Sequence, residues 1–97
     1  MKSFGEYLRN RREKLGLPLR KVAAELDIDT SALSKVERGE RPMSIDYLKP
    51  LSHILKIDDK ELQVRFLADS INAKYGKLDY LEDGLGEAIN QLKKKKK

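Results

Sequence analysis

Residues Leu19–Gly39 read LRKVAAELDIDTSALSKVERG, and this stretch decides the fold. Its apolar positions recur at helical spacing on both sides of a polar turn, at Val22, Ala23, Leu26, Leu33 and Val36. The stretch therefore predicts two short helices joined by a tight turn, with Ile28 as the apolar plug of that turn. The second helix carries small polar and basic residues on its other face. A helix with one packed face and one such polar face can enter the major groove of DNA.

The residues before this stretch predict a first helix with clear ends. Ser3 followed by Glu6 three residues later forms a capping box, the usual signal for a helix start. Gly16 stops this helix because glycine readily adopts the left-handed conformation that ends helices. Pro18 suits the first turn of the second helix, where its missing N–H costs no hydrogen bond.

Two more helices are predicted after Gly39. Ser44 caps the fourth, and one face of it carries the apolar residues Ile45, Leu48, Leu51 and Leu55. Pro50 lies inside this pattern and predicts a kink or a broken first turn. Asp58 and Glu61 form a second capping box, which opens a fifth helix that runs towards Gly76.

A sixth helix is predicted from about residue 79 to residue 93. Its apolar residues have the alternating spacing of a heptad seam, at Leu78, Leu81, Leu85, Ala88 and Leu92. Gly84 and Gly86 weaken this helix by about 1 kcal/mol each relative to alanine, so it needs a packing partner. Since no strand pattern occurs, the predicted fold class is all-α.

The chain resembles the Cro/phage-repressor type of helix-turn-helix domain, often called Xre-like, over roughly Phe4 to Leu62. The most specific part is Leu33-Ser34-Lys35-Val36-Glu37-Arg38-Gly39. A loop and an apolar run follow it, and Ala23 and Ile28 match at the centre of the second helix and after the turn. The resemblance implies a compact five-helix, lambda-repressor-like DNA-binding domain, to which this chain adds a C-terminal helix.

The resemblance also implies how such a domain works. The third helix would enter the major groove, and the protein would bind a two-fold symmetric operator as a homodimer. An arginine of the first helix often pairs with the glutamate that closes the recognition helix, and here these are Arg12 and Glu37. The chain departs from the family pattern at Leu19, where glutamine is common, and at Asp27, where glycine is common.

The DNA contacts are predicted from the outward positions of this motif. Base contacts should come from the start of the third helix, through Thr30, Ser31, Ser34 and Lys35. Phosphate contacts should come from the basic residues around it, Arg20, Lys21, Arg38 and Arg41. Because this reading surface is small, part of the specificity should come from DNA shape.

Simpler interpretations exist for several of these residues. Either Asp29 or Thr30 could cap the third helix, so Thr30 fits a cap as well as a base contact. Lys21 fits a solvated surface position as well as a phosphate contact. The run Lys93–Lys97 could be a nonspecific nucleic-acid arm or a disordered tail. His53 is interpreted as an ordinary side chain and not as a ligand or base.

Composition excludes several other classes of protein. The chain has 97 residues, no cysteine and a formal net charge of +5. No cysteine means no disulfide and no thiolate site, and with a single histidine there is no nucleophile paired with a base. We therefore expect neither an enzyme nor a metal or other cofactor. The N-terminus lacks the pattern of a secretory signal and no apolar run could span a membrane, so a cytoplasmic protein is expected.

Charge is unevenly distributed along the chain. Residues 1–44 hold ten lysines and arginines against seven acidic residues, whereas residues 45–92 hold six against nine. A basic N-terminal part suits contact with phosphates, and an acidic C-terminal part suits contact with protein. We divide the chain into a DNA-binding domain at residues 1–67, a helical extension at 68–92 and a basic tail at 93–97.

The extension holds more apolar residues than a five-helix core needs. We expect the fifth helix and the heptad segment to form the dimer interface through Phe66, Ile71, Tyr75, Leu78, Leu81, Leu85, Ile89 and Leu92. The alternative is that the sixth helix folds back on its own subunit. The whole pattern predicts a DNA-binding transcriptional regulator, and the alternatives are an antitoxin or a protein-interaction module that uses the same scaffold and binds a protein partner through the C-terminal helix.

Overall fold

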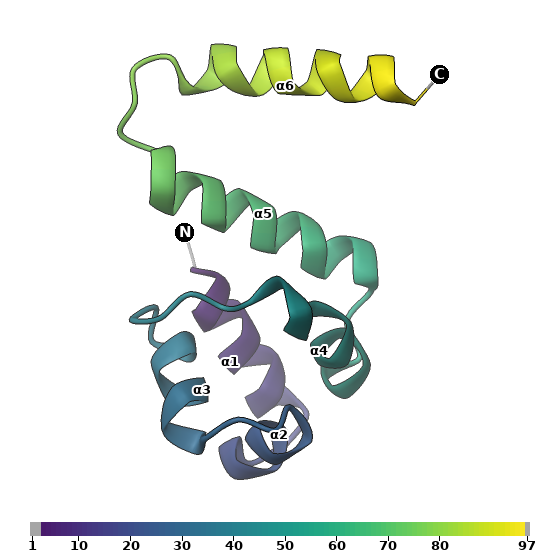
Figure 1. Cartoon of the computed structure of the whole chain (residues 1–97). Coiled ribbons are helices and arrows are strands. Elements are labelled where there is room, and N and C mark those ends of the chain that lie inside the picture. Colours follow the sequence, from purple (N-terminus) through teal and green to yellow (C-terminus); the bar gives the residue numbers. More distant parts are fainter. Residues whose placement is uncertain (1–2, 97) are drawn as a thin grey trace.

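The computed structural model describes residues 3–96, and over this range the chain contains helices and no strand (Figure 1). The all-α class predicted from the sequence is therefore confirmed. In chain order the helices are α1 (Phe4–Lys14), α2 (Leu19–Glu25), α3 (Thr30–Glu37), α4 (Leu48–Leu55), α5 (Asp59–Tyr75) and α6 (Leu81–Lys95). A short 3-10 turn, η1 (Ile45–Tyr47), precedes α4.

The predicted caps set the helix ends. The hydroxyl of Ser3 accepts a hydrogen bond from the Glu6 N–H at 3.2 Å, and the Asp58 carboxylate accepts one from the Glu61 N–H at 3.3 Å. Gly16 and Gly39 follow α1 and α3 with φ of +70° and +77°, the left-handed conformation that ends a helix. Helix α2 begins one residue later than predicted, because Pro18 precedes the helix and is not part of its first turn.

One core holds the first five helices together. Its buried apolar residues come from α1 to α5 and from the loops between them, and they are Phe4, Leu8, Val22, Ala23, Leu26, Leu33, Val36, Met43, Leu51, Leu55, Ile57 and Leu62. Phe66 packs edge-on against Phe4, with 5.5 Å between the ring centres. It is therefore engaged within its own chain, which limits its part in the predicted dimer interface.

The start of the fourth helix differs from the prediction at one residue. Ser44 caps the turn as expected, through the Asp46 N–H at 3.3 Å. Pro50 does break the first turn, because the chain begins as the 3-10 turn η1 and becomes α-helical only at Leu48. The 3-10 turn has three residues per turn, so the helical register does not continue back to Ile45. Ile45 is 65% exposed, and its predicted place on the buried face was wrong.

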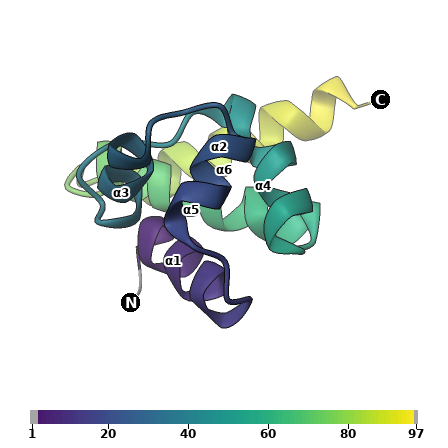
Figure 2. The same cartoon turned by 90° about the horizontal axis from the view of Figure 1, so that it is seen from below.

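Helix α6 begins and ends two residues later than the predicted range of 79 to 93, and it buries none of its residues. Lys93–Lys95 form its last turn, whereas the sequence placed them in a separate tail; Lys97 lies outside the described residues. Lysine is a good helix former, and a helix C-terminus favours positive charge, which explains the extension. Figures 1 and 2 show α6 on the side of the molecule away from α2 and α3, beyond α5. No helix among residues 3–96 is long and apolar enough to cross a membrane.

Candidate nucleic-acid interface

Helices α2 and α3 are joined by a tight turn that fixes their relative position. The backbone N–H groups of Asp27 and Ile28 donate to the carbonyls of Ala24 and Ala23 at 3.1 Å and 3.0 Å. Asp27 adopts the left-handed conformation, with φ of 57°, that glycine commonly supplies in the related family. Ile28 packs against the core as predicted. The pair of helices therefore forms one rigid unit with α3 at the surface.

The first turns of α3 present the predicted base-reading residues. Thr30, Ser31 and Lys35 are exposed, and Ser34 is half-buried. Asp29 is the residue that caps α3, although its side chain makes no capping hydrogen bond. Thr30 is therefore the first helical residue and not the cap, which leaves its hydroxyl and methyl groups at the surface.

The predicted phosphate-binding residues lie at the start of α2, at the end of α3 and in the loop that follows α3. Arg20 and Lys21 lie exposed in the first turn of α2, and Arg41 lies exposed in the loop after α3. Arg38 is exposed too, and its Nε lies 3.4 Å from both the Ser34 carbonyl and a Glu40 carboxylate oxygen. Leu19 packs against the core instead of reaching outward as a glutamine would, so the basic residue next to it, Arg20, is the one that faces solvent.

Arg12 connects α1 to the far end of α3. Its Nε and Nη2 donate to the two carboxylate oxygens of Glu37 at 2.8 Å and 3.0 Å, and its Nη1 donates to the Leu17 carbonyl at 2.8 Å. The two side chains are only 12% and 6% exposed. The hydrogen bonds from the guanidinium to Glu37 raise the pKa of Arg12 despite its burial. This bidentate pair fixes the orientation of α3 relative to α1.

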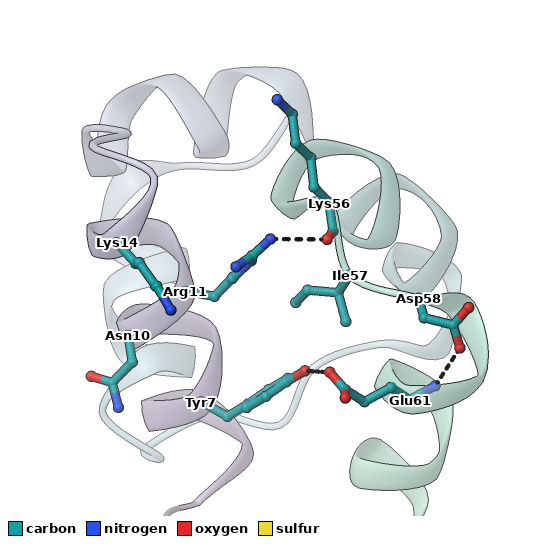
Figure 3. A pocket seen from close by; sticks show the side chains of 8 residues that line it. All are labelled: Tyr7, Asn10, Arg11, Lys14, Lys56, Ile57, Asp58 and Glu61. Carbon is teal, nitrogen blue, oxygen red and sulfur yellow. Dashed lines mark hydrogen bonds between the residues drawn. The ribbon is translucent and has the colours of Figure 1, made fainter.

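Sequence reasoning missed two contacts that support this arrangement. Gly5 lies so close to the end of α3 that a Cβ built there would fall 2.7 Å from the Glu37 carbonyl oxygen. Arg11, which the sequence predicts to be an ordinary surface residue, donates to the Leu55 carbonyl at 2.8 Å and to the Lys56 carbonyl at 3.0 Å, and Figure 3 shows the second of these bonds. These carbonyls lie at the end of α4, where a helix has no backbone partners of its own.

A third missed contact joins α1 to the start of α5. The hydroxyl of Tyr7 donates to the carboxylate of Glu61 (Figure 3). The guanidinium carbon of Arg65 lies 4.3 Å from the centre of the Tyr7 ring. Burial, followed by the hydrogen bond to Glu61 and its negative charge, raises the pKa of Tyr7 to about 12. A cavity of about 510 Å³ lies beside these residues. Because 54 residues separate Tyr7 from Glu61, no local pattern could have revealed the pair.

The described residues contain no candidate metal site. Among residues 3–96, no group of three or more histidine, cysteine, aspartate or glutamate side chains could hold a metal ion. The exposed polar side chains of α2 and α3 carry hydroxyl, ammonium and guanidinium groups, which proteins use to contact bases and phosphates, together with one carboxylate, that of Glu25.

Comparison with known proteins identifies the family. The model of a helix-turn-helix domain matches residues 3–64, which is the segment from the first capping residue to α5. Neither a curated protein nor a solved structure matches the chain. Because the matched segment covers more than half of the chain and contains α2, the turn and α3, the chain belongs to the helix-turn-helix domain family, whose domain indicates a DNA-binding regulator.

Proposed function

We propose that this protein is a cytoplasmic, sequence-specific transcriptional regulator of the Cro/phage-repressor (Xre-like) type, which binds a symmetric operator as a homodimer. The observation that carries the proposal is the exposed start of α3, on a helix whose far end is tied to α1 by the Arg12–Glu37 pair. A recognition helix needs a fixed orientation, because base contacts depend on positions accurate to a fraction of an ångström.

The roles of the exposed residues follow from their chemistry. Ser31 and Ser34 can donate to or accept from either kind of base, and the Thr30 methyl can contact thymine. Lys35 can donate to O6 and N7 of guanine. Arg20, Lys21 and Arg41 supply charge for the phosphates. Arg38 joins them by exchanging its exposed ion pair with Glu40, which is worth about 0–1 kcal/mol, for a phosphate oxygen.

Paired variants test whether α3 reads bases. Ser31→Ala/Lys35→Ala should weaken binding to the DNA upstream of the protein's own gene by about tenfold or more, the range expected for lost base contacts. It should weaken binding to a scrambled duplex much less, because only one phosphate-attracting charge is lost. Fluorescence anisotropy across a salt series measures both affinities.

Lys60→Ala is the matched control, because Lys60 is an exposed lysine of α5 outside the proposed interface. It should leave the preference for the operator unchanged. Equal losses on both duplexes in the Ser31→Ala/Lys35→Ala variant would contradict base reading by α3.

A second candidate function rests on the exposed apolar face of α6, on which Ile89 and Leu92 are 51% and 58% exposed. Such a face fits an antitoxin or interaction module that binds another protein through its C-terminal helix. This candidate predicts DNA binding that is weak and indifferent to Ser31 and Lys35, so the same anisotropy experiment separates it from the first.

A further inference from the structure

Helix α6 presents an apolar face that its own chain leaves uncovered. Ile89 and Leu92 are more than half exposed, and Leu85 is 37% exposed. Leu78, in the connection just before the helix, is also more than half exposed. An open apolar groove of about 520 Å³ runs between the end of α5 and the start of α6, and Ile71, Tyr75 and Leu81 are among its lining residues. Contiguous apolar surface of this kind marks a site of association.

Charge along the same segment is separated into two halves. Asp79, Glu82 and Asp83 lie at its N-terminal end, and Lys93–Lys96 lie at its C-terminal end. None of these charges forms an ion pair within residues 3–96, where the pairs are Arg9–Glu13, Arg12–Glu37 and Arg38–Glu40. The segment is thus acidic at one end, basic at the other and unpartnered at both.

This charge pattern is complementary to a reversed copy of itself. Two α6 helices in parallel would place acidic end against acidic end and lysine against lysine, whereas two antiparallel helices place each acidic end beside the partner's lysines. Like charges opposed across an interface destabilise it, and opposite charges favour it. An antiparallel pair is also the arrangement that a two-fold axis across the helices generates.

We propose that the occupant of this face is α6 of a second copy of the chain, paired antiparallel, with the lysine-rich end of each helix against the acidic end of the other. The inference rests on the proposed homodimer and assigns its geometry. The apolar residues of the two α6 helices match best when Leu81 of one lies across from Leu92 of the other and Leu85 lies across from Ala88. In this register Ile89 faces Gly84, where the chain leaves open space. Because α6 lies on the side away from α2 and α3, the pairing leaves α3 free (Figures 1 and 2).

Charge variants of the full-length chain test the orientation. Glu82→Lys/Asp83→Lys and Lys93→Glu/Lys94→Glu should each weaken the homodimer by about tenfold or more, and their equimolar mixture should restore it. A parallel pair would behave differently, because each variant alone would only replace one like-charged contact by another. Sedimentation equilibrium gives the dissociation constants, and circular dichroism checks that α1 to α5 stay folded, which is expected because α6 buries none of its residues.

The salt dependence of the dimer dissociation constant is a second test of the same proposal. The antiparallel dimer should weaken as salt is raised from low to moderate concentration, because its end contacts are attractive and exposed. A parallel dimer should strengthen, since salt would screen repulsion between its like-charged ends. A dimer that tightens with salt would therefore overturn the proposed orientation.

Cysteine cross-linking tests the register, and the absence of native cysteine makes it unambiguous. A mixture of Leu81→Cys and Leu92→Cys chains should form mixed disulfide dimers. Leu81→Cys alone should not, because its two copies would lie about 16 Å apart along the helix axis, beyond the reach of a disulfide. Efficient cross-linking of Leu81→Cys to itself in a stable dimer would overturn the antiparallel pairing and leave the homodimeric regulator intact. A chain that stays monomeric on and off the operator would overturn both.

Discussion

Arg12 combines three hydrogen bonds in one nearly buried side chain, to Glu37 and to the Leu17 carbonyl. Arg12→Ala should lower the free energy of unfolding by about 3 kcal/mol, because it leaves the Glu37 carboxylate buried without its partner. Urea unfolding followed by circular dichroism measures the change. Arg9→Ala is the matched control on the same helix, since the Arg9–Glu13 pair is half exposed and should cost under about 1 kcal/mol. Equal effects of the two variants would contradict a structural role for the Arg12–Glu37 pair.

Tyr7 predicts a change of stability at high pH. Its pKa is raised from the ordinary value of 10.0 to about 12, so the native state holds the phenol proton more tightly than the unfolded chain does. This contribution to stability is complete below pH 10 and is lost as the pH rises from 10 to 12. Tyr7→Phe should remove this part of the pH dependence, as measured by unfolding free energies between these pH values.

Tyr80→Phe serves as the control for Tyr7→Phe, because Tyr80 is 78% exposed. It should leave the pH dependence of the unfolding free energy unchanged. Ultraviolet titration of the native protein should show a phenol that ionises near pH 12 and that is missing from the Tyr7→Phe variant. A single common transition near the ordinary tyrosine pKa would rule out the Tyr7–Glu61 hydrogen bond.

At the scale of elements, α1 approaches the end of α3 through Gly5. Gly5→Ala should destabilise the fold by about 1–3 kcal/mol, because the added methyl group meets backbone carbonyls of Val36 and Glu37 that cannot rotate away. Thermal unfolding measures the effect. Gly86→Ala is the control, since a Cβ there meets nothing within 4 Å, and it should not lower the unfolding temperature. A Gly5→Ala variant as stable as the natural chain would show that the two helices can separate.

Local signals predicted the elements well, because capping and periodicity act within a few residues. The hydroxyl of Ser3, the carboxylate of Asp58 and the left-handed glycines after α1 and α3 all act at the predicted helix ends. The misplacement of Ile45 has a local cause too, since the 3-10 turn shifts the register that the apolar spacing implied. Contacts between elements were not predictable in this way. Arg11 reaches carbonyls 44 and 45 residues away, and no spacing rule connects them.

The candidate site was predictable only in part, and this part came from the family resemblance and the helical period rather than from capping signals. The pairing of Arg12 with Glu37 followed from the family resemblance and not from the residues themselves, which are 25 positions apart. The exposure of Thr30, Ser31 and Lys35 followed from the helical period, because the apolar residues on the opposite face of the same helix were predicted to be buried. The close contact at Gly5 could not be predicted from the sequence, because a glycine near a helix start can have several roles. Only the position of α3 in the structure shows that this glycine allows two helices to approach.

At the scale of the whole molecule, the chain separates two surfaces. The described residues extend over 42 × 31 × 21 Å, with α2 and α3 on one side and α6 on the other (Figure 1). The core of α1 to α5 lies between the two sides. A protein with this layout can contact DNA and a second protein surface at the same time without either blocking the other.

The lack of any buried residue in α6 has a consequence for the behaviour of the protein at different abundances. A lone helix of 15 residues is only marginally stable in water, so in a dilute monomer this segment should fray and be open to proteases. Association would supply its missing contacts, and mass action then ties its order to how much protein is present. The order of the last helix, the resistance of the chain to proteases and the occupancy of both half-sites would then rise together with protein concentration. While monomers predominate, the concentration of the dimer grows as the square of the monomer concentration.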